Sequence, residues 1–122
     1  MFRIGRAYTR PQIHSLVGGS LRSYLPHVRG QVVAACLRLD TNPAAPAVIL
    51  PGRGPGIEAA ADLLISQTTS VPTFLKRAPC AWEYVGEFLP ARWSRDPAEI
   101  KLNAQRSGRS DISMVIHMKR AS

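Results

Sequence analysis

The sequence has few cysteines and no long apolar segment. Cys36 and Cys80 are too few for a disulfide framework, and neither stands at the spacing of a metal site. No apolar run approaches the roughly 18 residues that a membrane span needs, and the opening MFRIGRAYTR lacks the apolar core of a secretory signal. We therefore expect a cytoplasmic protein with no metal site and no membrane segment. Cys36, inside the apolar run VVAACLRL, is expected to be a small buried side chain.

Acidic side chains are also scarce. The 122 residues include 8 aspartates and glutamates against 16 lysines and arginines, a formal net charge of +8. Within residues 1–57 the only acidic residue is Asp40, against seven arginines. A one-sided field of this kind attracts polyanions and supplies most of the non-specific affinity for nucleic acid. The surplus favours a nucleic-acid partner, with a basic surface that is merely solvated as the alternative.

Catalytic motifs are missing as well. His14, His27 and His117 form no metal-spaced pair with a cysteine or carboxylate, and there is no P-loop, nucleophile elbow or nuclease-like carboxylate cluster. The segment GRGPG at 52–56 lacks the spacing of a nucleotide-binding loop and is interpreted as a turn. We expect no enzyme activity and no cofactor.

The length fits one domain, residues 1–122, with a single core. Thr9 before RPQIHSLV predicts a capped helix over 10–17, and helical spacing of apolar residues predicts the main amphipathic helix over 56–67. Residues 96–108 are expected to be a short helix or an ordered loop. Strands are expected at 31–39, 47–51, 71–77, 81–93 and 111–118. The pattern predicts an α+β fold: a small, strongly curved sheet or partial barrel with one main helix and one or two short helices.

Residues 18–30, GGSLRSYLPHVRG, have the composition of a binding loop. Gly19 allows close backbone approach to a ligand, and Tyr24 supplies a flat face for a base. The candidate phosphate donors of this loop are Ser20, Arg22, Ser23 and Arg29. The alternative is a helix-terminating loop in which Tyr24 folds back into the core.

Two further segments combine cations with aromatic or turn residues. Lys76 and Arg77 end one expected strand, and Trp82 and Tyr84 share one face of the next, an arrangement suited to stacking on a base. Aromatic residues at this spacing are equally expected in a core. The segment QRSGRSD at 105–111 carries Arg106 and Arg109 and is interpreted as a finger that enters a groove, or as a solvated hairpin.

Several of these segments together resemble a known class of module. YTRPQIHSLVGGS, SYLPHVRGQVVAACLRLDTNPAAPAVIL, PTFLKR, WEYVGEF and RSGRSDISMVIHM resemble the DNA-reading modules N-terminal to HNH nuclease domains in bacterial modification-dependent restriction proteins. WEYVGEF is also similar to the Tyr-x-Gly strand of SRA and related PUA-like folds. No HNH domain is expected within these 122 residues, so the resemblance implies reading of DNA without cutting.

The resemblance implies a reader of double-stranded DNA that carries a modified base, 5-methylcytosine first of all. SRA domains flip that base into an aromatic pocket, at a cost offset by stacking and by hydrogen bonds to the base edge. Tyr24, Trp82 and Tyr84 would form the pocket, and Ser23 or Asp111 would accept from the cytosine amino group. Such a reader would associate with the nucleoid.

Other interpretations stay open at this point. A sequence-tolerant DNA- or RNA-binding module would share the arginine surplus without a preference for modified bases. An accessory subunit of a restriction system is a third interpretation. The sequence leaves monomer and homodimer both open.

Overall fold

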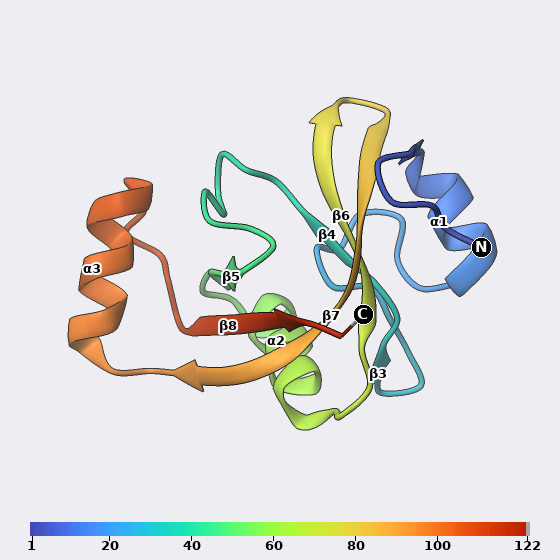
Figure 1. Cartoon of the computed structure of the whole chain (residues 1–122). Helices are drawn as coiled ribbons and strands as arrows, with labels where there is room; N and C mark the ends of the chain where they lie inside the picture. Colours follow the sequence, from blue (N-terminus) through green and yellow to red (C-terminus); the bar gives the residue numbers. More distant parts are fainter. Residues whose placement is uncertain (122) are drawn as a thin grey trace.

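The computed structural model describes residues 1–121 and has an α+β fold (Figure 1). In chain order its elements are β1 (Ala7–Tyr8), α1 (Arg10–Val17), β2 (His27–Val28), β3 (Gln31–Val32), β4 (Ala35–Leu37), β5 (Val48–Ile49), α2 (Pro55–Ser66), β6 (Val71–Ala78), β7 (Ala81–Ser94), α3 (Pro97–Ser107) and β8 (Val115–Arg120). The expected α+β class is confirmed, and so is the main helix, which begins and ends one residue earlier than predicted.

Six strands form one mixed sheet, and β2 and β3 form a separate hairpin. The order in the sheet is β4-β6-β7-β8-β5, with β1 paired to β7. Strand β4 is parallel to β6, and the other pairs are antiparallel. Because β4 and β5 stand at opposite ends of this order, the described part of the chain does not close into a barrel.

Strand β7 belongs to both halves of the sheet. From Ala81 to Phe88 it pairs with β6, and from Phe88 to Ser94 it pairs with β8. In Figure 1 the β6–β7 hairpin stands up beside α1, while the end of β7 runs toward α3 and β8 returns from it. The two halves of β7 therefore build two different ends of the molecule.

Side chains in the first half of β7 alternate between buried and half-exposed, as the sequence predicts. Trp82, Tyr84 and Phe88 are buried, whereas Glu83 and Val85 between them are half-exposed. This alternation places the aromatic residues against the core.

Two helices begin at side-chain caps. The Thr9 hydroxyl accepts from the Gln12 N–H at 3.2 Å while the Gln12 side chain accepts from the Thr9 N–H at 2.9 Å, a capping box for α1. The Asp96 carboxylate accepts from the Ala98 N–H at 3.0 Å and caps α3. The helix over 10–17 is confirmed, and residues 96–108, for which helix and loop were both open, contain a helix. Within residues 1–121 no helix is long and apolar enough to cross a membrane.

The hydrophobic core lies on both sides of the β6–β7 hairpin. Helix α2 packs Ala60, Ala61 and Leu64 into the main cluster. A second cluster lies beneath α1 and contains Ile13, Ala34, Cys36, Phe74, Trp82 and Tyr84. The expected burial of Cys36 is confirmed, and this burial raises the pKa of its thiol to about 11.

The predicted strand over 31–39 was wrong in extent. It is divided into β3 and β4, because backbone groups between the two strands and in β4 form hydrogen bonds with the preceding loop. The Val33 N–H donates to the Pro26 carbonyl at 2.9 Å, and the Cys36 N–H donates to the Tyr24 carbonyl at 2.8 Å. The loop over 18–30 is thereby attached along the edge of β4.

The predicted strands over 47–51 and 111–118 were also wrong in extent. Only Val48–Ile49 pairs in the first, and the closing strand is Val115–Arg120. The Ser113 N–H donates to the Pro51 carbonyl at 2.9 Å, and the Ser113 hydroxyl donates to the Gly52 carbonyl at 2.8 Å. These contacts join residues 111–114 to the turn before α2, so that the strand pairing starts later.

Candidate nucleic-acid interface

Three adjoining cavities share lining residues, and together we call them the basic groove. The central cavity is about 320 Å³ and is lined by Arg10, Leu21, Arg22, Tyr24, Cys36, Arg38, Thr41, Asn42, Lys76, Pro79 and Trp82. A cavity of about 280 Å³ shares Arg38, Lys76 and Pro79 with it and extends to Arg77. A third, of about 210 Å³, shares Tyr24, Thr41 and Asn42 and extends to Arg109 and Asp111. The central cavity thus joins residues of the sheet to the loop over 18–30, which we call the opening loop.

Trp82 lies at the floor of the central cavity and is 7% exposed. Two cations approach its ring: the Arg10 guanidinium at 5.3 Å and the Lys76 ammonium at 5.5 Å from the centroid. Lys76 is the cross-strand partner of Trp82 in the β6–β7 hairpin. Trp82 therefore belongs both to the core and to the groove, with cations held at its face.

The guanidinium of Arg10 also holds the opening loop. One nitrogen, Nη2, donates to the Ser20 carbonyl at 2.9 Å and to the Ser23 carbonyl at 2.8 Å. Within the loop the Ser20 hydroxyl accepts from the Arg22 and Ser23 N–H groups, both at 3.0 Å. The loop is therefore ordered by its own backbone and by α1, and Arg22 projects from it into the groove lining.

Tyr24 separates the central cavity from the third one, because it lines both. Its ring packs against the main core, and its hydroxyl donates to the Ile57 carbonyl at 2.7 Å. Burial, with the carboxylates of Asp62 and Glu58 nearby, raises the pKa of the Tyr24 hydroxyl. Tyr24 thus folds back toward the core, as in the alternative interpretation, and still forms one wall of the groove.

Positive charge dominates the groove lining. Six cations line the three cavities against two carboxylates, Asp40 and Asp111. Three of the six are in ion pairs: Arg38 with Asp40, Arg77 with Glu83 and Arg109 with Asp111. No carboxylate of residues 1–121 lies within 4.0 Å of Arg10, Arg22 or Lys76. These three cations are concentrated around the central cavity.

One end of the groove is fixed by Arg109. Its Nη1 donates to the Thr41 carbonyl at 2.9 Å and to the Leu50 carbonyl at 2.7 Å, and its Nε donates to Asp111 at 2.9 Å. The side chain is only 15% exposed. Arg109 therefore joins three segments of the chain and lies in the wall of the groove, with little freedom to project from it.

Tyr84 lies outside the groove lining, although it shares a strand face with Trp82. Its ring lies 5.5 Å from both Phe2 and Phe74 in an aromatic cluster, and its hydroxyl donates to Glu87 Oε2 at 2.6 Å. Burial and this hydrogen bond raise the pKa of Tyr84. The N-terminal segment covers Tyr84, which a reading of β7 alone does not reveal.

Other predicted contacts also lie apart from the groove. Gly19 closes the loop at φ +82°, where a Cβ would stand 2.7 Å from Pro26 Cβ. Arg29 is exposed in the turn between β2 and β3, and Arg106 is exposed on α3, where it lines a different cavity. Ser20 and Ser23 serve the loop's internal hydrogen bonds and do not line the cavities. The groove thus gathers Arg22, Tyr24, Lys76, Arg77, Trp82, Arg109 and Asp111 from the predicted set.

The sequence analysis missed four polar residues that line the central cavity: Arg10, Arg38, Thr41 and Asn42. Arg38 follows the end of β4 and Lys76 lies near the end of the adjacent parallel strand β6. Two cations at neighbouring strand ends are a signal that the sequence contains once the pairing is known. Arg10 gives no such signal, because its approach to the groove depends on how α1 packs against the sheet.

Neither a metal site nor a similar known protein adds to the description of the basic groove. Among residues 1–121 no group of three or more histidine, cysteine or acidic side chains is placed to hold a metal ion. No protein-family model, curated protein or solved structure matches the chain.

Proposed function

We propose that this chain binds double-stranded DNA carrying a modified base, 5-methylcytosine first of all, with the base flipped into the central cavity of the basic groove. The observation that carries the proposal is the cavity of about 320 Å³ between Tyr24 and Trp82, with Arg10, Arg22 and Lys76 around it. Phosphate contacts supply most DNA affinity, and enclosure by aromatic side chains offsets the cost of extruding a base.

The lining residues divide into two roles under this proposal. The exposed Arg22, with Arg38 and Arg77 on the rim, contacts phosphates on either side of the extruded nucleotide. Tyr24 and Trp82 enclose the base, and Leu21 and Pro79 offer apolar surface to a methyl group. A fitted methyl group adds about 1 kcal/mol, which corresponds to a preference of about fivefold.

The base edge requires a polar acceptor near the cavity. Thr41 lines the central cavity, and its Oγ1 accepts from Asn42 Nδ2 at 3.2 Å and keeps a second lone pair for a base. The Asp111 carboxylate lies beyond Tyr24 and already accepts from Arg109. Asn42 Oδ1 is likewise occupied, because it accepts from the Leu50 N–H at 2.8 Å. We assign the acceptor role to Thr41.

The proposal also includes a fold similar to that of SRA and PUA-like modules. The mixed sheet with three helices agrees with the α+β class that the resemblance to SRA and PUA-like modules implies. The strongly curved sheet or partial barrel of those modules, association with the nucleoid, and the absence of catalytic activity are parts of the same proposal.

A second candidate is a DNA- or RNA-binding module that does not distinguish modified bases. Trp82 is only 7% exposed and has two cations at its ring, so it offers a base little free surface. A groove that binds the backbone alone would need the cations but no open aromatic face.

Binding of matched methylated and unmethylated duplexes, measured by fluorescence anisotropy with an RNA competitor, tests both candidates. We expect about fivefold tighter binding of the methylated duplex and increased fluorescence from a 2-aminopurine placed beside the methylated base. Equal affinities without this increase would favour the second candidate, and no binding to any nucleic acid would overturn both. Methylated plasmid incubated with the protein and Mg²⁺ or Mn²⁺ should remain intact.

A further inference from the structure

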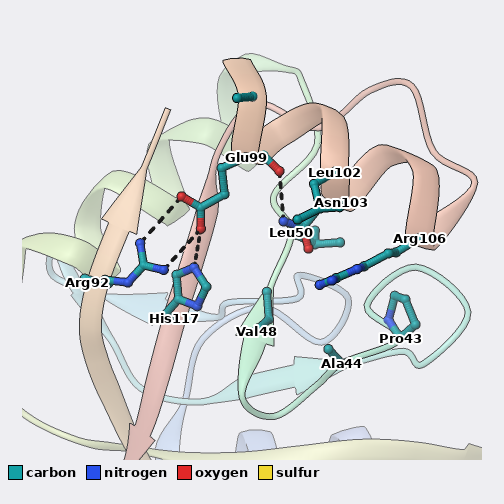
Figure 2. A pocket seen from close by; sticks show the side chains of 11 residues that line it. Pro43, Ala44, Val48, Leu50, Arg92, Glu99, Leu102, Asn103, Arg106 and His117 are labelled. Atoms are coloured by element: carbon teal, nitrogen blue, oxygen red, sulfur yellow. Dashed lines mark hydrogen bonds and ion pairs between the residues drawn. The ribbon is translucent and has the colours of Figure 1, made fainter. Parts of the chain in front are cut away.

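A separate cavity lies beside α3, away from the centre of the basic groove. It is about 670 Å³ and is lined by Pro43, Ala44, Val48, Leu50, Arg92, Ala98, Glu99, Leu102, Asn103, Arg106 and His117 (Figure 2). Only Leu50 is shared with the groove. This volume is within the range of small-molecule sites, roughly 300 to 1,000 Å³.

Two apolar walls face each other across this cavity, which we call the α3 cavity. Pro43 and Ala44, which precede β5, form one wall with Val48 of β5, and Leu102 of α3 belongs to the other. Leu102 is 45% exposed, and no residue of α3 is fully buried. An amphipathic helix normally buries its apolar stripe, so the space beside Leu102 is suited to an apolar ligand.

The carboxylate in the lining, Glu99, already has hydrogen-bond partners. Glu99 accepts from His117 Nε2 at 2.5 Å and from Arg92 at 3.4 and 3.5 Å (Figure 2). The hydrogen bond from His117, followed by the contacts with Ser94 and Arg92, holds the pKa of Glu99 below its ordinary value. Glu99 is therefore held in place on one side of the cavity.

Arg106 is the lining cation without such a partner. No carboxylate of residues 1–121 lies within 4.0 Å of it. Figure 2 shows its side chain extending from α3 across the cavity toward β5. One guanidinium matches one carboxylate, with two parallel hydrogen bonds. A phosphate of higher charge would be served poorly by a single cation with Glu99 in the same lining.

We propose that the α3 cavity binds a small amphiphilic monocarboxylate, its apolar body between Val48 and Leu102 and its carboxylate on Arg106. The site is separate from the proposed DNA interface in both location and ligand chemistry.

Titration of the ¹⁵N-labelled full chain with octanoate tests this site. We expect saturable amide shifts in α3 and around Val48 and His117. Octanamide, which has the same body without the charge, should bind about tenfold more weakly or worse, because a hydrogen-bonded charge is lost. Absence of saturation, or shifts confined to the basic groove, would overturn the proposal.

Three variants locate the carboxylate and the body. Arg106→Gln should weaken octanoate binding about tenfold or more, whereas Lys101→Gln, with the same charge change at an exposed position of α3 outside the lining, should leave it unchanged. Ala98→Phe fills the cavity from an exposed helical position and should abolish binding. Equal binding by Arg106→Gln and wild type would contradict the site, as would equal loss in Lys101→Gln. Lys76→Gln, in the basic groove, should bind octanoate as wild type does.

Discussion

Arg10 and Trp82 lie 72 positions apart in the sequence and are in contact, with the guanidinium 5.3 Å from the ring centroid. The same guanidinium donates to the carbonyls of Ser20 and Ser23. One side chain thus joins α1, the opening loop and the floor of the basic groove. The position of the loop over the sheet depends on this contact.

Replacing Arg10 by lysine should separate its structural role from its charge. The lysine keeps the positive charge and cannot reproduce the geometry of the two carbonyl contacts. We expect a loss of about 1 to 2 kcal/mol in the free energy of unfolding, measured by urea denaturation. DNA affinity should fall while the dependence of log affinity on log salt stays the same. Arg3→Lys, at an exposed position outside the groove, is the matched control. An unchanged free energy of unfolding in Arg10→Lys would contradict the structural role of the two carbonyl contacts.

The groove cations should govern the salt dependence of DNA binding. Arg22→Gln and Lys76→Gln should each make the slope of log affinity against log salt shallower by about one unit, equally for methylated and unmethylated duplexes. Arg29→Gln tests the sequence-based prediction for a residue that the structure places outside the groove, and its slope should equal that of wild type. If Arg29 changes the slope and the other two do not, the interface lies on the β2–β3 hairpin instead.

The aromatic residues should affect base preference in different ways. Trp82→Phe, which keeps an aromatic ring in the core, should reduce the methylated-to-unmethylated affinity ratio, because stacking contributes about 1 to 3 kcal/mol per base. Tyr84→Phe removes only the hydroxyl bonded to Glu87 and should leave the ratio unchanged. Thermal unfolding of each variant confirms that it is folded. An unchanged ratio in folded Trp82→Phe would remove Trp82 from the pocket.

Stability should depend on pH through Glu99. The pKa of Glu99 is lowered from 4.5, first by His117. A lowered pKa in the folded state means that the stabilisation is fully present above pH 4.5 and is lost as the pH falls through the folded-state value. Wild type should therefore exceed Glu99→Gln by roughly 1 kcal/mol near pH 6, and the difference should vanish in acid. Denaturant unfolding across this pH range measures it, and a constant difference would contradict the assignment.

Sequence patterns predicted those helices and strands that are fixed by contacts among their own residues. The pairing of Thr9 with Gln12 caps α1 in any context, and the alternation across 81–88 was enough to place β7. The division of 31–39 was not predictable in this way, because it depends on the carbonyls of Tyr24 and Pro26, which another part of the chain brings to the strand. Hydrogen bonds to backbone groups outside a segment cannot be predicted from the sequence of that segment.

The candidate groove was predictable to a similar degree. Lys76 and Trp82 face each other because a hairpin fixes cross-strand neighbours. Tyr84 shares the face of Trp82 by the same rule, yet Phe2 from the distant N-terminal segment covers it. Arg10 reaches the groove only through the packing of α1. Each of these outcomes depends on which element covers which part of the sheet.

Strand β7 has a consequence for how the two proposed binding surfaces are connected. Its first half carries Trp82 at the groove floor, and its second half carries Arg92, which holds Glu99 in the α3 cavity. Because central β7 amides are bonded on one edge to β6 and on the other to β1 or β8, their hydrogen exchange should require global unfolding. Cutting the chain within β7 would therefore yield no autonomous half. We therefore expect the two proposed surfaces to unfold together, as parts of one cooperative unit.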